Sequence, residues 1–482
     1  MLSRLARFLW KAVKWTFLVA MTLFTLAVLI NWRDEALSDE ALALLETTPI
    51  KVPDNENIFV AMAGFNAPEG DDIFEVGRRR IEKIEKELEK DPSGFKLTFE
   101  GFKEQGEREE LRWQEMNPPF DCLYDEKTDF LECIHSQKDR LEKTLTANET
   151  LIRRYHLLHE LPHYATHQNP NALFFMEWYS AASYVQRSLV ARALLDIESR
   201  NADAGLTFFR KEQAFWRRIF EEKSFLFDSM AAMTMMTINV HRLSLLLSSA
   251  SVNVEGQALE WREMLMPLSH EQYRLRSAIK GEIRFMHNVL PTMKKRVSYQ
   301  EEVERLDVVC PFIKTDTGTC SAWRVWLKQN FQTFFFQPNA TFNYGVPFFK
   351  TWLSLTDLPW KEYIEQRDEA LAPLAVRSEP GIGWIYNPVG KGQSHYIYLW
   401  DTYVGRLHDL DAYLRMVRLQ LELRLKKIPS EEISAFIEQL DEAYCAPCSD
   451  FSWDAETRML SFQPYRENSF LLLVSASVYV PE

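Results

Sequence analysis

FLFDSMAAMTMMTINVHRLSLLLSS (residues 225–249) is the stretch that decides the fold. From Ser229 to Val240 it carries no charged residue, and this uncharged run is too short to cross a bilayer as a helix. Its methionines are more typical of flexible core filler than of a promiscuous binding groove, which is the alternative. We therefore predict a buried helix at the centre of a helical bundle.

Helical periodicity continues on both sides of this stretch. Residues 136–161, 172–199 and 203–222 form a nearly continuous helical pattern with short polar connections, which is typical of antiparallel neighbours in a bundle. Glycine contributes only 16 of 482 residues, which favours long helices over turn-rich sheets. Near the end, FSW and MLSF predict a β-hairpin, and the β-branched run at 470–481 predicts a strand beside it.

Three smaller segments carry their own predictions. Residues 71–90 read as a charged helix, whereas the apolar run 58–63 is too short for a periodicity argument and predicts a strand or a buried connector. Leucines at spacings of three and four predict a long amphipathic helix over 399–428. On it, His408, Asp409 and Asp411 indicate a solvated face, with an acid/base or metal cluster as the alternative.

The first 33 residues differ in character from the rest of the chain. No Lys, Arg, Asp or Glu occurs from Trp15 to Trp32, which is long enough for one transmembrane helix. Basic residues precede this run and acidic residues follow it, so the positive-inside rule keeps the N-terminus in the cytoplasm. A cleavable signal peptide is the alternative, although no small-residue cleavage site closes the run. The expected location is the bacterial inner membrane, with the bulk of the chain in the periplasm.

The six cysteines fall as three neighbouring pairs, which is typical of an oxidising compartment. The predicted disulfides are Cys122–Cys133, Cys310–Cys320 and Cys445–Cys448. The last pair could instead be a redox-active C-x-x-C, but a helical segment precedes it and a strand-like hairpin follows, the reverse of the redox arrangement. We expect structural disulfides.

The fold class is thus mainly α: an N-terminal transmembrane helix, a multi-helix exported bundle and a small C-terminal β element. Five consecutive segments describe the expected organisation. They are the cytoplasmic tip and anchor (1–33), a membrane-proximal segment with a charged helix and a disulfide loop (34–135), the helical bundle (136–300), an aromatic-rich connection (301–395), and the long helix with the β element (396–482).

The string HELPH at residues 159–163 matches the H-E-x-x-H pattern of zinc proteases. In that pattern His159 and His163 would bind zinc and Glu160 would activate water, with Glu177 as a third ligand. Pro162 argues against this, because proline has no N–H for an intrahelical hydrogen bond and should end the helix near His159 or Leu161. We expect surface histidines at a helix end, with a zinc site as the alternative.

The stretch 323–360 is unusually aromatic. Aromatic side chains dominate protein cores, so this run most simply seals an interface between helical layers; an exposed lipid- or peptide-binding surface is the alternative. The residues that would form such a surface are Phe334, Phe335, Phe336, Phe342, Tyr344, Phe348 and Phe349.

Several scattered motifs together resemble a group of bacterial single-span membrane proteins. They are NIFVAMAGFNAPEGDDIFEVG (57–77), LIRRYHLLHELPHY (151–164), QAFWRRIF (213–220), FQPNATFN (336–343), NPVGKGQS (387–394) and RLHDLDAYLRMVRLQLELR (406–424). The resemblance implies the anchored topology and a packing role for Arg154, Tyr155, Pro162 and Tyr164. It carries over no catalytic residue.

The functional expectation is a non-catalytic, membrane-anchored protein that binds an envelope or exported protein partner, as scaffold, chaperone or immunity-type module. The alternatives are a zinc-dependent hydrolase that uses HELPH and a protein that binds lipid or envelope fragments through the aromatic region. The net charge of −13 argues against a nucleic-acid partner. We expect no cofactor.

Overall fold

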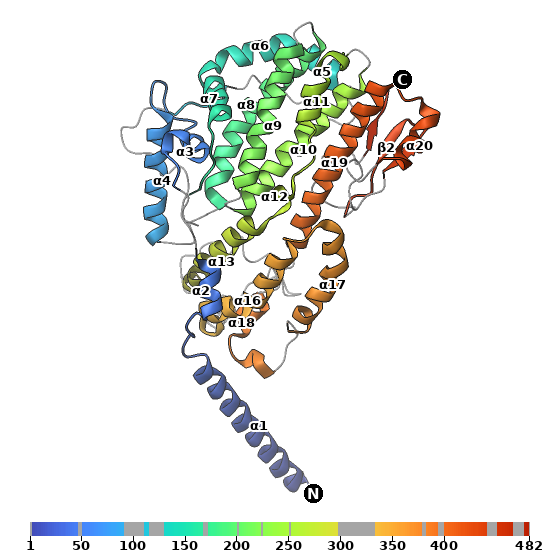
Figure 1. The fold of residues 1–482 in the computed structure, drawn as a ribbon. Coiled ribbons are helices and arrows are strands. Elements are labelled where there is room, and N and C mark those ends of the chain that lie inside the picture. Colours follow the sequence, from blue (N-terminus) through green and yellow to red (C-terminus); the bar gives the residue numbers. More distant parts are fainter. Residues whose placement is uncertain are drawn as a thin grey trace. The chain divides into compact units, whose positions relative to one another are not determined.

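The computed structural model describes residues 2–46, 51–90, 110–114, 130–166, 172–199, 202–222, 225–249, 252–296, 333–377, 382–393, 400–440, 451–465 and 477–481. This part of the chain is mainly helical, with a three-stranded sheet near the C-terminus (Figure 1). The predicted mainly α class with a small C-terminal β element is confirmed.

The chain divides into two compact units, each built from segments far apart in sequence. Unit 1 combines Met1–Thr47, Ile283–Trp352 and Arg367–Tyr398, and unit 2 combines Thr48–Glu282, Leu353–Gln366 and Leu399–Glu482. The five consecutive segments expected from composition stay a prediction. The division falls within α13 (Arg276–Arg296), α16 (Pro338–Leu355) and α17 (Trp360–Arg377), so composition shifts along the chain could not mark it.

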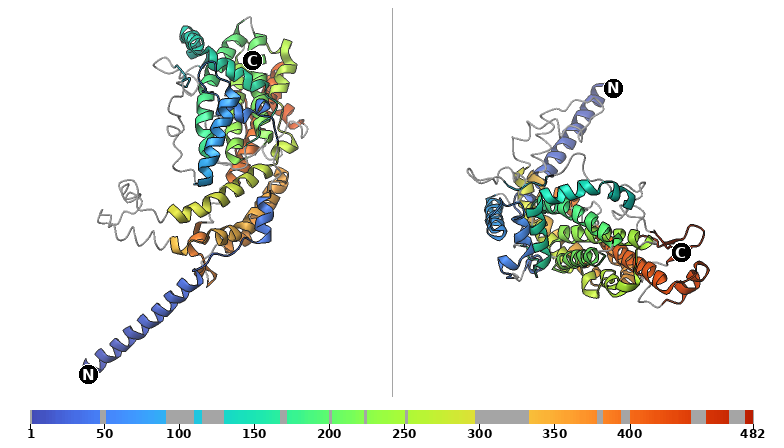
Figure 2. Two further views of the ribbon diagram at one scale, coloured as in Figure 1. Left: turned by 90° about the vertical axis from the view of Figure 1, so that its left-hand side faces the viewer. Right: turned by 90° about the horizontal axis from the view of Figure 1, so that it is seen from above.

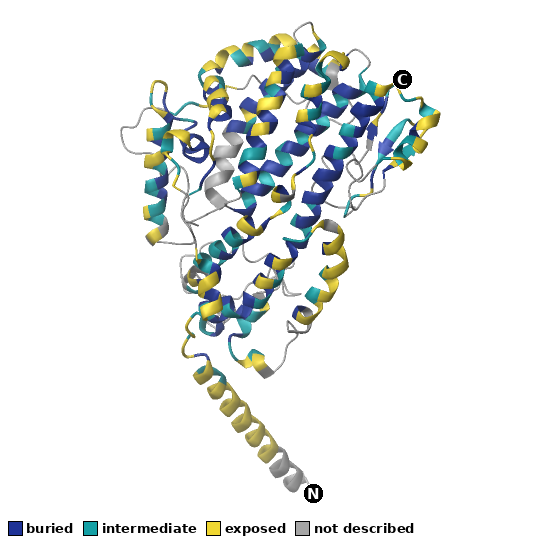
Figure 3. Cartoon of the chain, in the orientation of Figure 1, coloured by how far each residue is buried: buried dark blue, intermediate teal, exposed yellow. Residues whose placement is uncertain are grey.

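The core of unit 2 is a layer of long helices. These are α8 (Ala172–Glu198), α9 (Ala202–Glu222), α10 (Leu226–Ser248) and α19 (Trp400–Lys426), which lie side by side in sequence order (Figures 1 and 2). Most of α10 is buried, as its uncharged centre predicts, and Met233 and Met236 are core residues. Figure 3 shows the same burial along α19.

Shorter elements surround this layer in unit 2. They are α3 (Ile58–Ala63), α4 (Ile73–Lys90), α5 (Phe130–Ser136), α6 (Lys138–Ala147), α7 (Glu149–Glu160), α11 (Ala258–Met264), α12 (His270–Tyr273) and α20 (Ile433–Glu438). The sheet has the order β1-β2-β3, all antiparallel, with β1 (Ser452–Asp454), β2 (Met459–Ser461) and β3 (Ser477–Tyr479). The predicted hairpin is confirmed, and β3 contacts α10 and α19.

The prediction for residues 58–63 was wrong, because they form the helix α3. The Asn57 side chain caps the helix by accepting a hydrogen bond from the Phe59 N–H, and all six helical residues are buried. Burial on every side removes the polar face that would reveal a helical period. Tertiary packing, rather than pattern, decides this element.

Two glycines allow the backbones of α3 and α4 to contact each other directly. A Cβ added at Gly77 would lie 2.0 Å from the Val60 carbonyl oxygen, and one added at Gly64 would lie 1.8 Å from the Ile73 carbonyl oxygen. Backbone atoms cannot move aside as a flexible side chain can, so both positions require glycine.

Gly77→Ala is therefore expected to lower the free energy of unfolding by about 1–3 kcal/mol, the usual cost of overpacking a core. Urea denaturation of the full chain measures it. Gly256→Ala is the matched control, because a Cβ there meets nothing within 4 Å. Equal midpoints for the two variants would contradict the close approach.

Unit 1 contains α1 (Leu2–Ile30), α2 (Asp39–Leu45), α18 (Pro388–Gln393) and the greater parts of α13 and α16. From Trp10 to Ile30, α1 is apolar enough and long enough to cross a bilayer, and none of this stretch is buried. In Figure 3 nearly all of this stretch has the colour of exposed residues.

Candidate functional site

The HELPH string is split by the end of a helix. α7 ends at Glu160, and Leu161 is already extended, with φ −73° and ψ 132°, as the proline argument predicts. His163 lies beyond the helix, where its carbonyl accepts a hydrogen bond from the Ile58 N–H. His159 and His163 therefore do not share one helix face.

His159 is buried, so the expectation of a surface histidine was wrong for this residue. Its Nε2 lies 2.9 Å from Oε2 of Glu212, a fully buried carboxylate on α9. The same carboxylate accepts hydrogen bonds from the Tyr155 hydroxyl at 3.0 Å, the Gln186 amide at 3.0 Å and the Trp216 indole N–H at 2.5 Å. We call these five residues the Glu212 cluster.

The cluster keeps an acid ionised inside the protein. Burial alone would raise the pKa of Glu212, but hydrogen bonds from His159, Trp216 and Gln186 lower it below its ordinary value. Burial, reinforced by the neighbouring Glu212 charge, raises the pKa of Tyr155 well above its usual range, so the phenol stays protonated and donates. The cluster thus joins α7, α8 and α9 through charge-assisted hydrogen bonds.

Burial also limits what this cluster can do chemically. The side chains of His159 and Glu212 have no exposed surface, so neither can meet a substrate from solution. Gln186 extends the cluster to Asn239 on α10, at 3.3 Å. The arrangement is suited to fixing the mutual register of four helices.

The other residues of the zinc-site alternative are Glu160, His163 and Glu177. Glu160 is exposed and pairs with Lys211 at 2.6 Å, and Nδ1 of His163 lies 3.9 Å from Oε1 of Glu222. Glu177 lies within α8, but its side chain falls outside the described residues. Among the side chains that the structure describes, no three His, Cys, Asp or Glu groups converge as metal ligands.

Of the packing residues implied by the resemblance, Arg154, Tyr155 and Tyr164 are buried, whereas Pro162 is exposed. Arg154 donates hydrogen bonds to the carbonyls of Phe65, Ala67 and Pro68, which lie between α3 and α4. Tyr155 and Tyr164 are also in the core. The guanidinium group has several N–H donors, so one arginine can bind all three backbone carbonyls at once.

The prediction that the charged residues of α19 form a solvated face was wrong. His408, Asp409 and Asp411 are buried, not solvated. Asp411 accepts hydrogen bonds from the Leu268 N–H at 2.7 Å and from Arg415 at 2.6 Å, and Asp409 accepts one from the Tyr465 N–H. His408 stacks on Tyr273, and burial lowers its pKa to about 3. The three side chains serve different neighbours and form no cluster.

The aromatic residues belong largely to the core of unit 1. Phe335, Phe336, Phe342, Tyr344, Phe348 and Phe349 are buried, and Phe334 is partly buried. The rings of Phe342 and Phe349 lie 5.4 Å apart, and Gly345 leaves the space that the Phe349 ring occupies. In the described part of the run, these side chains form packing contacts rather than an open surface.

The predicted disulfides stay predictions. Cys133 lies on α5, whereas Cys122, Cys310, Cys320, Cys445 and Cys448 lie outside the described residues.

Sequence reasoning missed the buried polar joint that follows α1. Asn31 is 1% exposed; its side chain donates to the Ile385 carbonyl at 2.8 Å and accepts from the Asn387 N–H at 2.8 Å. The Gln337 side chain donates to the Asn31 carbonyl at 2.6 Å. The Asp34 carboxylate accepts hydrogen bonds from N–H groups in the first turn of α16. We call Asn31, Asp34, Gln337 and Asn387 the joint.

Two prolines carry the signal that could have revealed the joint. Pro338 and Pro388 are the first residues of α16 and α18, the position where proline is favoured, and Gln337 and Asn387 directly precede them. Both pairs occur in quoted motifs, FQPNATFN and NPVGKGQS. The free N–H groups of a helix start suit an acid such as Asp34.

No protein-family model, curated protein or solved structure matches this chain.

Proposed function

We propose that this protein is anchored by α1 in the bacterial inner membrane, holds its bulk in the periplasm and binds an envelope or exported protein partner without catalysing a reaction. The observation that carries the proposal is the exposed apolar surface of α1, which leads directly into the joint. A flexible tether would follow an anchor that only retains a protein. Here buried hydrogen bonds fix the end of the anchor to unit 1.

The setting of the HELPH residues supports binding over hydrolysis. A zinc hydrolase needs ligands that converge and a position open to substrate. His159 and Glu212 are sealed in the core, and Glu160 is paired at the surface with Lys211. These contacts suit a stable helical body that presents a surface.

The anchor is tested by replacing Leu23 and Leu26 with arginine in the full chain. Each arginine near the middle of a span costs about 2.5–3.5 kcal/mol on the insertion scale. We expect the unmodified chain to stay in the membrane pellet after alkaline carbonate extraction and the double variant to appear in the supernatant. Leu42→Arg, at an exposed position on α2, is the control and should stay in the pellet.

Three further results would contradict the proposal. A mature chain that lacks α1 would mean a cleaved signal, and protection of the bulk from protease added to spheroplasts would mean the opposite orientation. Stoichiometric zinc that is lost in His163→Ala would favour the hydrolase. His163 suits this test because its side chain is 46% exposed and is not part of the core.

Partner binding is tested with a photo-crosslinker at the exposed Leu259, where we expect one discrete adduct in cells.

A further inference from the structure

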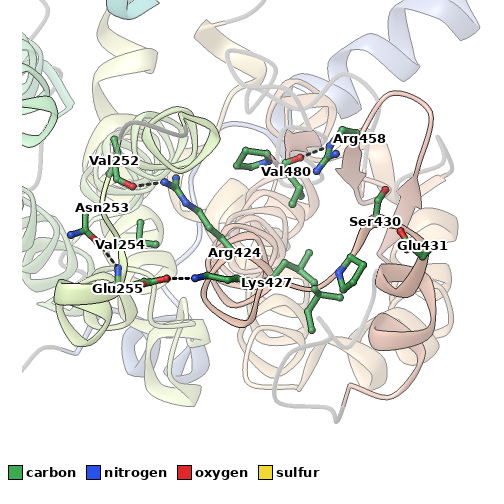
Figure 4. A pocket seen from close by; sticks show the side chains of 14 residues that line it. Val252, Asn253, Val254, Glu255, Arg424, Lys427, Ser430, Glu431, Arg458 and Val480 are labelled. Carbon is green, nitrogen blue, oxygen red and sulfur yellow. Dashed lines mark hydrogen bonds and ion pairs between the residues drawn. The ribbon is translucent and has the colours of Figure 1, made fainter.

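A pocket of about 530 Å³ lies in unit 2, at the C-terminal end of α19. In Figure 4 the segment from Val252 to Glu255 lines one side of Arg424 and Lys427, and Arg458 and Val480 line the other. Its volume falls within the range of small-molecule sites. The pocket is separate from the Glu212 cluster and from the joint, because it shares no residue with either.

The pocket wall combines an aliphatic part with positive charge. Val252, Val254, Leu423 and Val480 contribute apolar surface, and each is at most 3% exposed. Arg424, Lys427 and Arg458 supply cations, while Glu255 and Glu431 supply carboxylates. A positive balance here contrasts with the net charge of −13 of the whole chain.

Arg424 is held in place without being neutralised. Its guanidinium donates to the carbonyls of Leu247 at 2.9 Å and Ser249 at 2.8 Å, and to that of Val252. Within the described residues its hydrogen-bond acceptors are these uncharged carbonyls, which belong to the end of α10 and the loop that follows it. Burial lowers the pKa of Arg424, which reflects the cost of a cation in this position. An anion in the pocket would offset that cost.

The backbone conformation at Lys427 and Arg458 is an independent indication that the pocket is a binding site. Among the described residues, the non-glycine residues with positive φ are Asn387, Lys427 and Arg458, at 51°, 52° and 58°. Two of these three line the pocket. Lys427 follows the last residue of α19 and Arg458 directly precedes β2, and glycine is the usual residue at both kinds of position.

A left-handed conformation is unfavourable for a residue that carries a Cβ. Strain of this kind is concentrated at sites where the side chain has a use. At Asn387 that use is visible, because its amide binds Gln337, Thr341 and Gly390 in the joint. At Lys427 the side chain pairs with Glu255 at 2.9 Å, and both are largely exposed, so this pair contributes little and can open.

We propose that this pocket binds an amphipathic anion, whose hydrocarbon part lies on the valine wall and whose acid group meets Lys427 and Arg458. A carboxylate and a phosphate monoester share the required chemistry. Arg458 is oriented for this role by its own hydrogen bond, Nε to the Val480 carbonyl at 2.9 Å. The site is independent of the proposed partner binding.

The test uses the full chain in lipid nanodiscs and equilibrium dialysis against octanoate, with empty nanodiscs to subtract uptake by lipid. We expect saturable binding of octanoate or octyl phosphate, and the preferred acid identifies the headgroup. Acetate, which lacks the hydrocarbon part, and octanol, which lacks the charge, should each bind at least tenfold more weakly.

The variant Lys427→Gly distinguishes the loss of a ligand contact from the loss of the folded structure. Glycine relieves the left-handed strain, so this variant should unfold at the same temperature as the parent or higher. We expect its affinity for the preferred probe to fall roughly tenfold, as for the loss of one charged contact. Lys426→Gln is the matched control, because Lys426 does not line the pocket and its Nζ lies 5.0 Å from the Phe436 ring centre. Octanol binding as tight as that of octanoate, unchanged affinity in Lys427→Gly, or no saturable binding of either acid would overturn the proposal.

Discussion

Replacing Glu212 with alanine is expected to lower the free energy of unfolding by about 3–5 kcal/mol, the usual effect of removing one partner from a buried charged pair. The substitution leaves His159, Tyr155, Gln186 and Trp216 without their common acceptor in a sealed core. Each unsatisfied donor then carries its full desolvation cost. Urea denaturation of the full chain, followed by near-ultraviolet circular dichroism, measures the loss.

Glu160→Gln is the control for this experiment. Glu160 directly follows His159 of the cluster, but its carboxylate is exposed and pairs with Lys211. Its removal should leave the unfolding midpoint unchanged. Glu212→Gln keeps the size of the side chain but presents an amide to four donors, so it should lie between Glu212→Ala and the parent. A parent-like midpoint for Glu212→Ala would show that the cluster contributes no stability.

Acidification from pH 7 to pH 5 is expected to cost about 2 kcal/mol of stability at each of two buried histidines. Burial lowers the pKa of His408 to about 3 and that of His241 to about 4, from an ordinary value of 6.5. Below pH 6.5 the unfolded chain binds protons at these positions and the folded chain does not. Stability is therefore complete above this pH and falls as the pH decreases toward the folded-state values.

Two variants isolate this effect from the titration of acids. His408→Phe keeps a ring to stack on Tyr273, and His241→Asn keeps a side-chain acceptor near the Tyr413 hydroxyl. Neither variant can take up a proton at the substituted position, so the slope of stability against pH between 5 and 7 should decrease in each. Leu259→Gln, a substitution at an exposed position that does not titrate, should keep the parent slope. An unchanged slope in both buried variants would mean that these histidines are not held neutral.

The helices of unit 2 could largely be predicted from sequence, because period and length are local properties. α4, α8, α9 and α10 lie where the apolar spacing placed them, and the uncharged centre of α10 correctly indicated burial. Pro162 likewise predicted the end of α7 through its missing N–H. Each of these features depends on residues within a few positions of one another.

What could not be predicted depends on distant partners. An alternating charge pattern on α19 favoured a solvated face, yet the buried Asp411 and Asp409 accept hydrogen bonds from the backbone N–H groups of Leu268 and Tyr465. His159 similarly acquires its buried role from Glu212, 53 residues away. The pocket residues Lys427 and Arg458 carry no motif at all. Their common feature is a backbone conformation, which is a property of the folded chain.

The joint has a consequence for the order in which the chain can fold during synthesis. Asn31 and Ile385 are 354 residues apart, so the residue that follows α1 is made long before the segment that binds it. The uninterrupted segment Thr48–Glu282 of unit 2 emerges in between. Closing so long a loop costs little more free energy than closing a shorter one, but contacts between distant residues form slowly. Unit 1 is thus completed late, after most of the chain has left the ribosome, and a chain interrupted before Ile385 would leave the Asn31 side chain without its hydrogen bonds to Ile385 and Asn387.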